Sequence, residues 1–254
     1  MIKLEKTQVV GLEPAIRGMR NPMNSWDRSD SDWKDIVFYA DDEPYAENHA
    51  FVVGPEDKNL MMRLAKGGSV HAKYRRMIVV YVDITAPLYW WKEFDTYKVG
   101  TVANSCSTMH KIQAKEFTLE DFSGEHLIDF KDNDFEYDEC PWYNRESWSS
   151  KFILEIVIKA LNFYRNRYNV MARRLKDETL TESERKHFAS KQKHYWWQMI
   201  QLLPSSYNQK RTIMLNYEVL AGIYPMRKDH KLDEWHDFCA WIKDLPHSEV
   251  IIGE

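Results

Sequence analysis

Hydrophobic and polar residues follow two different patterns along this chain, and the change between them divides it into two parts. Residues 1–20 have the pattern of a strand followed by a turn, and residues 77–84 (MIVVYVDI) are rich in β-branched residues, which favour strands. Short helices are predicted at 59–66, before a Gly-Gly pair, and at 88–98, where Pro87 occupies a first-turn position. The N-terminal part therefore predicts a sheet accompanied by short helices.

Through most of the second half, apolar residues recur every three or four positions, which is typical of amphipathic helices. Thr181 and Glu184 have the spacing of a capping box at the start of one of these helices. The helices are predicted, in chain order, at 151–176 with Ser150 as cap, 182–203, 207–224 and 232–243. The fold class that follows is α+β, with an N-terminal sheet packed by long C-terminal helices.

The chain shows no internal repeat and no low-complexity linker, so a single domain over residues 1–254 is the simplest organisation. Two segments interrupt the pattern, at about 21–58 and 115–148, and both are predicted to be irregular, the first with one short helix at most. The second is strongly acidic, with six Asp and Glu residues between positions 129 and 139. A calcium-binding loop needs a central Gly that is missing there, so a solvated loop is the preferred interpretation.

Charge and cysteine content exclude several classes of protein. The chain has 35 Lys and Arg against 39 Asp and Glu, a formal net charge of −4, which argues against a globally basic nucleic-acid binder, and we expect no nucleic acid among its partners. No stretch approaches the ~20 apolar residues that cross a bilayer, and the N-terminus has no signal-peptide core. Three cysteines without a CxxC pair suit a reducing cytosol, so we predict a cytoplasmic protein without membrane contact.

Local motifs of enzyme chemistry are few. The P-loop, the dinucleotide fingerprint, HExxH and GxSxG are all missing from the sequence. Cys106 lies in a polar segment with His110 four residues later and is a candidate reactive thiol, although a small residue in a turn is the simpler interpretation. His187 and His194 share a helix face but lack a third ligand, so we predict no metal site. Aromatic residues make up 14% of the chain and indicate either an aromatic core or a pocket for a planar ligand.

Two blocks of residues go beyond these generic patterns. In the first, the strand at 77–84 leads into Ala86-Pro87, a helix to Lys98, and the run ANSCSTMH at 103–110. In the second, Leu202-Leu203-Pro204 is followed by Asn216, twelve residues after the proline, and by Arg227, eleven residues later. Over about residues 60–245, this order resembles the flavin-dependent thymidylate synthase (ThyX) family, where both C-terminal spacings recur. Asn104 and Ser107 match the Asn and Ser of the family's Asn-Glu-x-Ser-x-Arg-Tyr pattern.

The signature itself departs from the family pattern at the positions where the family uses charged residues. Thr96-Tyr97-Lys98 stands where the family has Arg-His-Arg, with a one-residue insertion before Asn104. Ser105 replaces the family's Glu, Met109-His110 replaces its Arg-Tyr, and Ile200 replaces the Arg before the Leu-Pro. Met and Ile cannot reproduce the bidentate contacts that a guanidinium makes with phosphate.

The resemblance implies a ThyX-like fold and a flavin-dependent methyl transfer. In the family, FAD mediates the transfer of a one-carbon unit from methylene-tetrahydrofolate to deoxyuridylate, and NADPH reduces the flavin. The family is tetrameric, with sites between subunits, so a homotetramer that binds a pyrimidine nucleotide is implied here by analogy. The protein's task would be to orient the cofactor and shape its electrostatics.

The same resemblance implies roles for individual residues. Arg227 would contact the pyrimidine and favour its anionic form, because a fixed cation stabilises developing negative charge in a dry site. Ser107 would be the second catalytic residue, in contact with the nucleotide. Asn216 and Arg227, about three helical turns apart, face the same way if the helix is continuous, which Pro225 could prevent. The implied substrate-binding residues are Asn104, Ser105, Ser107 and Arg227, and the implied cofactor-binding residues are Asn216, Tyr97 and Lys98.

The lost arginines leave a second hypothesis open. The scaffold could be retained without catalysis, in a protein that binds a nucleotide or acts as a structural or interaction partner, with the acidic segment 129–139 and exposed aromatic residues as its surface. The tryptophans either stack on an aromatic ligand or fill the core; the candidates are Trp90, Trp91, Trp196 and Trp197.

Overall fold

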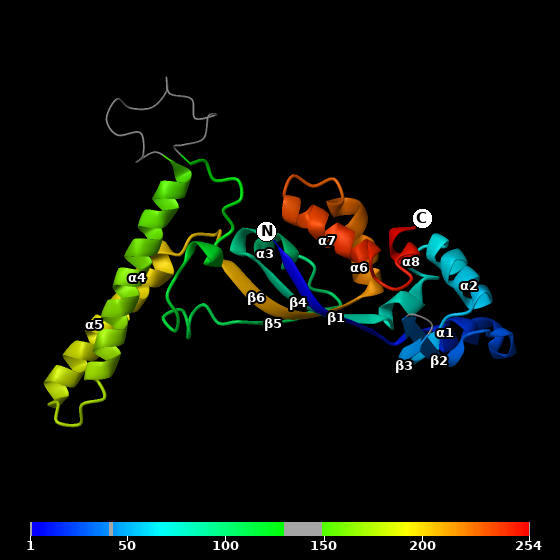
Figure 1. The fold of residues 1–254 in the computed structure, drawn as a ribbon, viewed down its shortest axis with the longest axis horizontal. Helices are drawn as coiled ribbons and strands as arrows, with labels where there is room; N and C mark the ends of the chain where they lie inside the picture. The colour runs from blue at the N-terminus through cyan, green and yellow to red at the C-terminus, as the bar shows by residue number, and fades with distance from the viewer. Residues whose placement is uncertain (1, 41–42, 130–148, 254) are drawn as a thin grey trace, which may run out of the picture. The chain divides into compact units, whose positions relative to one another are not determined.

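The computed structural model describes residues 2–40, 43–129 and 149–253, which form two compact units. The sheet unit comprises residues 2–85, 94–104 and 211–254, and the helical unit comprises residues 86–93 and 105–210. Figure 1 shows the elements of both units. The mixed α+β class predicted from the sequence is confirmed, because the chain combines an antiparallel sheet with long helices.

The sheet has four strands in the order β1-β4-β6-β5. Strand β1 (Lys3–Val10) pairs antiparallel with β4 (Val79–Pro87), from Lys3 opposite Thr85 to Val10 opposite Val79. The strand predicted at 77–84 is thus confirmed, and every second side chain of β4 is buried, as a half-buried strand requires. The other strands are β5 (Thr101–Ser105) and β6 (Asn208–Asn216).

The helix predicted over 207–224 is wrong in its first half. Residues up to Asn216 form β6, and only then does helix α6 (Tyr217–Arg227) begin. Within β6, Ile213 and Leu215 are fully buried, while Thr212 before them is exposed and Met214 between them is half-buried, so the strand period of two applies. Because the pairing partners of β6 come from residues more than a hundred positions earlier, a local helical pattern could not reveal them.

The N-terminal third contains more regular structure than predicted. Helix α1 (Leu12–Arg20) stands where a turn was expected, and β2 (Asp32–Ala40) pairs with β3 (Glu43–Val52) in a hairpin where an irregular segment was expected. Gly11 permits the sharp entry into α1: its φ is +91°, and a Cβ there would lie 2.2 Å from the Met77 carbonyl oxygen.

Helix α2 (Pro55–Lys66) begins four residues before the predicted start, with Pro55 in its first turn. The C-terminal helices of the sheet unit are α6, α7 (Asp233–Lys243) and α8 (Glu249–Ile252), and α7 confirms the predicted helix at 232–243. Short 3-10 turns complete this unit: η1 (Asn21–Met23), η2 (Trp26–Arg28) and η3 (Lys73–Arg76). Its core is aromatic, since Phe94, Trp235 and Phe238 are almost fully buried against one another.

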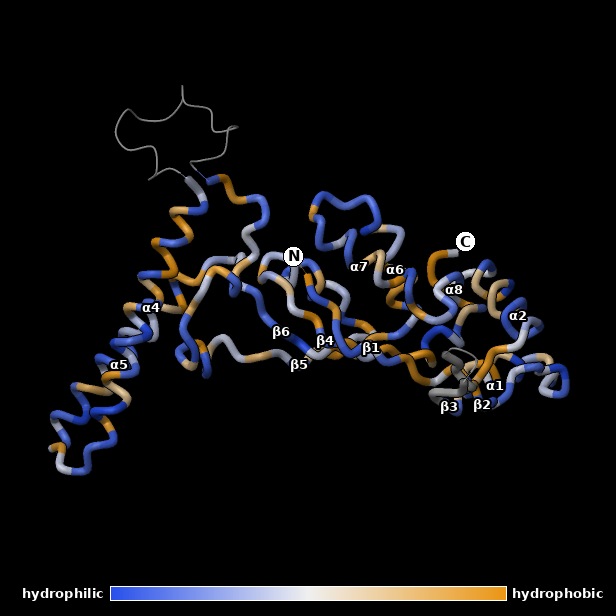
Figure 2. The backbone as a smooth tube through the Cα atoms, viewed as in Figure 1, coloured by the Kyte–Doolittle hydropathy of each residue, from blue (hydrophilic) through white to orange (hydrophobic). Residues whose placement is uncertain are grey.

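The helical unit is dominated by two long helices, α4 (Ser150–Arg174) and α5 (Glu182–Leu202), which pack against each other as a hairpin (Figure 1). The predicted capping box is confirmed: the backbone N–H of Glu184 donates to Thr181 Oγ1, and Thr181 donates back to the Glu184 carboxylate. The cap of α4 is Ser149, one residue before the predicted Ser150. Figure 2 shows hydrophobic and hydrophilic positions alternating along both helices.

Helix α3 (Leu88–Phe94) is shorter than predicted, and its two tryptophans fill the core: Trp90 and Trp91 are buried, and the Trp91 indole donates to the Gln209 carbonyl at 3.0 Å.

The acidic segment 115–148 is irregular where it is described, apart from the short turn η4 (Leu119–Asp121). Residues 130–148, with most of the predicted acidic loop, lie outside the described residues. A hydrophobic cluster packs the α4–α5 hairpin against residues 112–122; its members are Ile112, Phe117, Phe122, Leu154, Ile158, Leu161 and Met199.

Candidate functional site

Arg227 and Asn216 lie at opposite ends of α6. Asn216 is its N-cap and accepts the Val219 backbone N–H on Oδ1 at 3.0 Å, while Arg227 is its last residue. The helix continues through Pro225, so the two residues belong to one continuous helix of the expected length. Gly100 (φ +80°) lies against Asn216, and a Cβ at that position would come within 3.0 Å of the Asn216 amide. Asn216 therefore caps a helix in the sheet unit.

The Arg227 guanidinium is held by aromatic residues of its own unit. Its Nε donates to the Tyr97 hydroxyl at 2.8 Å, and its central carbon lies 4.6 Å from the Trp235 ring and 5.5 Å from the Tyr97 ring. These distances are typical of cation–π contacts. Tyr97 in turn packs edge-on against Phe94 and Trp235. Arg227 is half-buried, and its orientation is fixed before any ligand arrives.

Two further predicted residues of the sheet unit, Lys98 and Asn104, are exposed. Lys98 follows Tyr97 directly, and neither Lys98 nor Asn104 has an ion pair or hydrogen bond with another side chain among the residues that the structure describes. Both are therefore open to solvent.

Ser105 and Ser107 belong to the helical unit. Ser107 Oγ accepts the backbone N–H groups of Met109 and His110, at 3.2 and 2.9 Å, and so shapes the turn at 107–110. Those two bonds occupy the acceptor capacity of the hydroxyl and leave its proton available as a donor. Ser107 also lines a cavity of about 440 Å³, within the size range of small-molecule sites. Ser105 is exposed at the end of β5 and does not line that cavity.

The cavity around Ser107, called the Ser107 cavity from here on, combines cations with aromatic rings. Lys115 forms an ion pair with Asp121 at 2.6 Å, and Lys111 is exposed. Phe117 and Tyr207 supply aromatic walls in edge-to-face contact. Burial raises the pKa of Tyr207, so its hydroxyl stays protonated and can donate a hydrogen bond.

Cys106 lines the same cavity and is exposed. Its backbone is fixed by two bonds: its N–H donates to the Lys210 carbonyl at 2.9 Å, and its carbonyl accepts from the Gln209 amide at 2.7 Å. Within the described residues no hydrogen bond joins the Cys106 thiol to His110, the residue that was to supply a charge. The cysteine is therefore a turn residue on the cavity wall.

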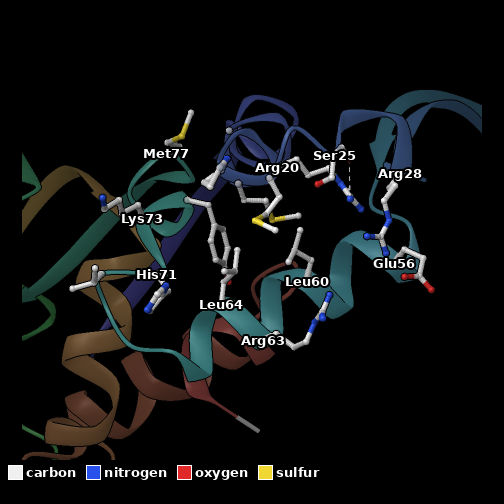
Figure 3. Close-up of a pocket in the computed structure, with 16 residues that line it drawn as sticks. Arg20, Ser25, Arg28, Glu56, Leu60, Arg63, Leu64, His71, Lys73 and Met77 are labelled. Carbon is white, nitrogen blue, oxygen red and sulfur yellow. Dashed lines mark hydrogen bonds between the residues drawn. The ribbon is translucent and has the colours of Figure 1, made fainter.

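A larger cavity of about 650 Å³ lies in the sheet unit, between α1, α2 and η3 (Figure 3). Its apolar lining comes from Met19, Leu60, Leu64, Tyr74 and Met77, among others. The Tyr74 hydroxyl donates to the Met61 carbonyl at 2.8 Å, and burial raises its pKa to about 12. Four cationic or titratable side chains surround this lining, and none of them forms an ion pair with another described residue: Arg28, Arg63, His71 and Lys73. This cavity is called the α1–α2 cavity from here on.

One wall of the α1–α2 cavity rests on a buried ion pair. Arg20 Nε donates to Asp57 Oδ1 at 2.6 Å, and both side chains are almost completely buried. The other Asp57 oxygen accepts the hydroxyls of Ser29 and Ser31 at 2.6 and 2.7 Å. Burial alone would raise the pKa of Asp57, but the hydrogen bonds from the two serines and Arg20 outweigh it and hold the pKa below its usual value. The charged pair is thus fully hydrogen-bonded.

No motif or pattern in the sequence pointed to the α1–α2 cavity. Arg28, Arg63, His71 and Lys73 lie in η2, in α2, in the turn after α2 and in η3, so they form no motif. The segment 21–31 was expected to be an irregular loop, yet Asp30 caps α2 by accepting the backbone N–H groups of Glu56 and Asp57. The possible sequence signal was a run rich in Asp and Ser some 25 residues before a helix that begins with Pro. Its meaning, a cap for that helix, becomes visible only in the folded structure.

The four candidate tryptophans differ in burial. Trp90 and Trp91 are core residues, whereas Trp196 is half-buried and Trp197 is 43% exposed. The Trp196 indole donates to the Met109 carbonyl at 2.9 Å, so it braces the turn beside Ser107. Across residues 2–40, 43–129 and 149–253, no three His, Cys, Asp or Glu side chains are grouped as metal ligands. None of the described helices combines the length and apolarity that a membrane span requires.

Comparison with solved structures identifies the fold. Thymidylate synthase X (ThyX) from Helicobacter pylori, crystallised with FAD and dUMP, matches with a TM-score of 0.53 and 14% identity over 100% of this chain and 98% of that one. A second structure of flavin-dependent thymidylate synthase ThyX from Helicobacter pylori, complexed with FAD and dUMP, gives the same TM-score and identity over 99% and 98%. By sequence, no protein-family model and no curated protein matches. The chain therefore has a ThyX-like fold.

Proposed function

We propose that this chain is a divergent ThyX-like protein that binds a pyrimidine nucleotide of the deoxyuridylate type in the Ser107 cavity. The observation that carries the proposal is the set of side chains that line this cavity together with Ser107. Two lysines and two aromatic rings line one cavity of nucleotide size. A nucleotide presents a phosphate, which cations and hydroxyl donors bind, and a flat base, which packs on aromatic rings. Lys111 and Lys115 supply the charge in place of the arginines that the family uses.

FAD is the cofactor of this proposal. Its binding site must provide cations for the diphosphate and an apolar surface for the planar ring. Asn216, Tyr97 and Lys98 fit poorly as a set, because Asn216 Oδ1 caps α6 and the Tyr97 hydroxyl accepts from Arg227, which leaves one exposed lysine for two phosphates. The α1–α2 cavity fits better. Its apolar lining suits the flavin ring, and basic side chains for the diphosphate lie at both ends, with His71 and Lys73 at one end and Arg28, beside the carboxylate of Glu56, towards the other, where Arg63 also lies (Figure 3).

When bound, a reduced flavin supplies the reducing equivalents for a reductive methylation, with NADPH and methylene-tetrahydrofolate as co-substrates. The residues of this chain contribute binding and orientation: cations neutralise the flavin diphosphate, and the apolar lining of the cavity excludes water from the ring. Methyl transfer, the tetramer and the cytoplasmic location remain predictions. They follow from the resemblance and from composition.

Arg227 does not line the Ser107 cavity, so its proposed role of stabilising an anionic pyrimidine would be played from another subunit of the proposed tetramer, whose sites lie between subunits in the family that the chain resembles. The support for this role is pre-organisation, because Tyr97 and Trp235 already fix the guanidinium and little side-chain entropy remains to be lost on binding. Arg227→Ala is expected to abolish nucleotide turnover or to weaken nucleotide binding by at least tenfold. Arg227→Lys keeps the charge but loses the planar fork, so it separates charge from geometry.

The test measures both ligands on the full chain. Protein mixed with FAD and desalted is expected to be yellow, with a flavin absorption spectrum, and dUMP is expected to raise the melting temperature, because a ligand that binds only the folded state stabilises it. Lys111→Ala should reduce the dUMP shift, whereas Lys92→Ala, an exposed lysine of α3 that does not line the Ser107 cavity, should not. A colourless protein with no response to dUMP would overturn the proposal.

A second candidate function, an inactive ThyX-fold binding protein, is favoured by one specific observation. The side chains carried over from the family, Asn216, Ser107 and Arg227, each make structural contacts within the protein. Scaffold packing alone would retain them. Binding of dUMP without uptake of FAD would favour this second function over methyl transfer.

A further inference from the structure

The α4–α5 hairpin carries a charge that the whole-chain average conceals. Between residues 150 and 202 there are eleven Lys and Arg against five Asp and Glu, a formal net charge of +6, although the whole chain has −4. The remainder of the chain is therefore at −10. The expectation that no nucleic acid binds rested on the average, yet phosphate binding requires a surplus of cations on one surface only.

Most of these cations are not neutralised by the protein itself. Lys151 pairs with Asp129, Lys186 pairs with Glu182, and Arg185 donates to the carbonyls of Leu175 and Asp177. The other eight form no ion pair with any described carboxylate, and all but the half-buried Arg165 are exposed: Lys159, Arg165, Arg167, Arg173, Arg174, Lys176, Lys191 and Lys193. Unpaired cations at this density repel one another, so an external anion is the natural partner.

The unpaired cations come together because the two helices are antiparallel neighbours. The rings of Tyr164 and Tyr195 stack with centroids 6.4 Å apart, which sets the register of α4 against α5. With a rise of about 1.5 Å per residue, Arg167 lies at nearly the same height as Lys191 and Lys193. Arg173 and Arg174 follow within two turns. Residues 167–193 of the hairpin therefore combine eight Lys and Arg with four Asp and Glu, a formal net charge of +4.

Helix-end electrostatics explain only part of this distribution. Arg173 and Arg174 lie in the last turn of α4, where the helix dipole favours cations. Arg167 is two turns earlier, and Lys191 and Lys193 lie in the middle of α5, where the dipole has little effect. Two aromatic side chains are also exposed near the middle of the hairpin, Phe163 at 51% and Trp197 at 43%, and the Arg167 guanidinium lies 5.2 Å from the centre of the Phe163 ring.

We propose that the α4–α5 hairpin, from its middle to its distal end, binds single-stranded nucleic acid. Cations contact the phosphates, and exposed aromatic rings provide surfaces on which unpaired bases stack, the two elements that single-strand binding combines. An anionic membrane is the less suitable partner, because the exposed apolar side chains of α4, Ile153, Ile156 and Phe163, precede the cations at 167–176 and do not alternate with them. This inference is independent of the proposed nucleotide site.

The test is fluorescence anisotropy of a labelled single-stranded oligonucleotide of about 16 nucleotides, with the full chain at about 50 mM salt and above. Arg173→Glu with Arg174→Glu is expected to weaken binding by about tenfold or more and to reduce the slope of log K against log salt by about 1.4, since each phosphate contact contributes about 0.7. Arg173→Lys with Arg174→Lys keeps the charge and should bind nearly as the native chain does.

The matched control is Lys34→Glu with Lys231→Glu, which changes the net charge equally at two exposed lysines of the sheet unit. It should weaken binding by less than about twofold, and circular dichroism should show equal helix content in all variants. The proposal is overturned if the native chain does not bind at low salt, if both charge-reversed pairs weaken binding equally, or if the chain binds phosphatidylserine vesicles but not the oligonucleotide.

Discussion

The two cavities of this protein are built in different ways. The wall of the α1–α2 cavity contains Arg20, which pairs behind the wall with Asp57; the two side chains are 5% and 0% exposed, and serine hydroxyls donate to the Asp57 carboxylate. In the Ser107 cavity, Lys115 pairs with Asp121, but the lysine side chain is 73% exposed. A buried pair fixes the backbone around it, whereas an exposed pair is screened by water. The first cavity is therefore pre-formed by internal electrostatics, while the second depends on the turn at Ser107.

The largest effect should come from breaking the buried pair. Asp57→Asn removes the charge, keeps the shape and leaves Arg20 buried without its counter-ion, so we expect the free energy of unfolding to fall by about 3–5 kcal/mol in urea titrations. Glu56→Gln, the exposed neighbour on α2, should change it by less than about 0.5 kcal/mol. Equal effects of the two substitutions would show that the Arg20–Asp57 pair does not support this cavity.

The stabilising contributions of the Arg20–Asp57 and Lys115–Asp121 pairs should be lost at opposite ends of the pH scale. The pKa of Asp57 is lowered in the folded state, so its contribution is present above the unfolded pKa of about 3.9 and is lost as the pH falls through the folded value. The pKa of Lys115 is raised, chiefly by its bond to Asp121, so its contribution is lost as the pH rises through the folded value. Thermal unfolding of the native chain, Asp57→Asn and Lys115→Met across this range checks both signs.

A crossed binding experiment sharpens the assignment of ligands to cavities. Arg63→Ala should weaken FAD binding by about tenfold and leave dUMP binding unchanged, whereas Lys111→Ala should do the reverse, because a charged hydrogen bond contributes about 1.5–3 kcal/mol. Isothermal titration of both ligands with both variants measures the four affinities. If each variant weakens both ligands alike, the two cavities do not bind separate ligands.

The smallest effect is expected from the exposed pair. Lys115→Met should lower the free energy of unfolding by only about 0.2–1 kcal/mol, since water screens a pair whose lysine is mostly exposed. Urea unfolding beside Asp57→Asn gives the comparison directly. A loss as large as that of Asp57→Asn would mean that Lys115 is a structural element of the Ser107 cavity.

Much of the fold followed from local pattern alone. The strand at 77–84, the long helices at 151–176 and 182–203, the helix at 232–243 and the capping box at Thr181 are all present, because each has a strong period or a local cap. The site residues were less predictable. Asn216 and Arg227 do belong to one helix, but their contacts with Val219, Tyr97 and Trp235 involve side chains that the spacing could not specify.

By itself, then, the sequence determined the α+β class, most helices and the order of segments that resembles ThyX, since these depend on neighbours within a few residues. Only the tertiary structure decided that residues 208–216 form a strand, that Asp57 meets Arg20 across 37 positions, and that dispersed cations surround a cavity. Strand pairing, buried ion pairs and cavity walls join residues far apart in the chain. The free energy that selects them comes from burial and pairing in the folded state, which no local pattern encodes.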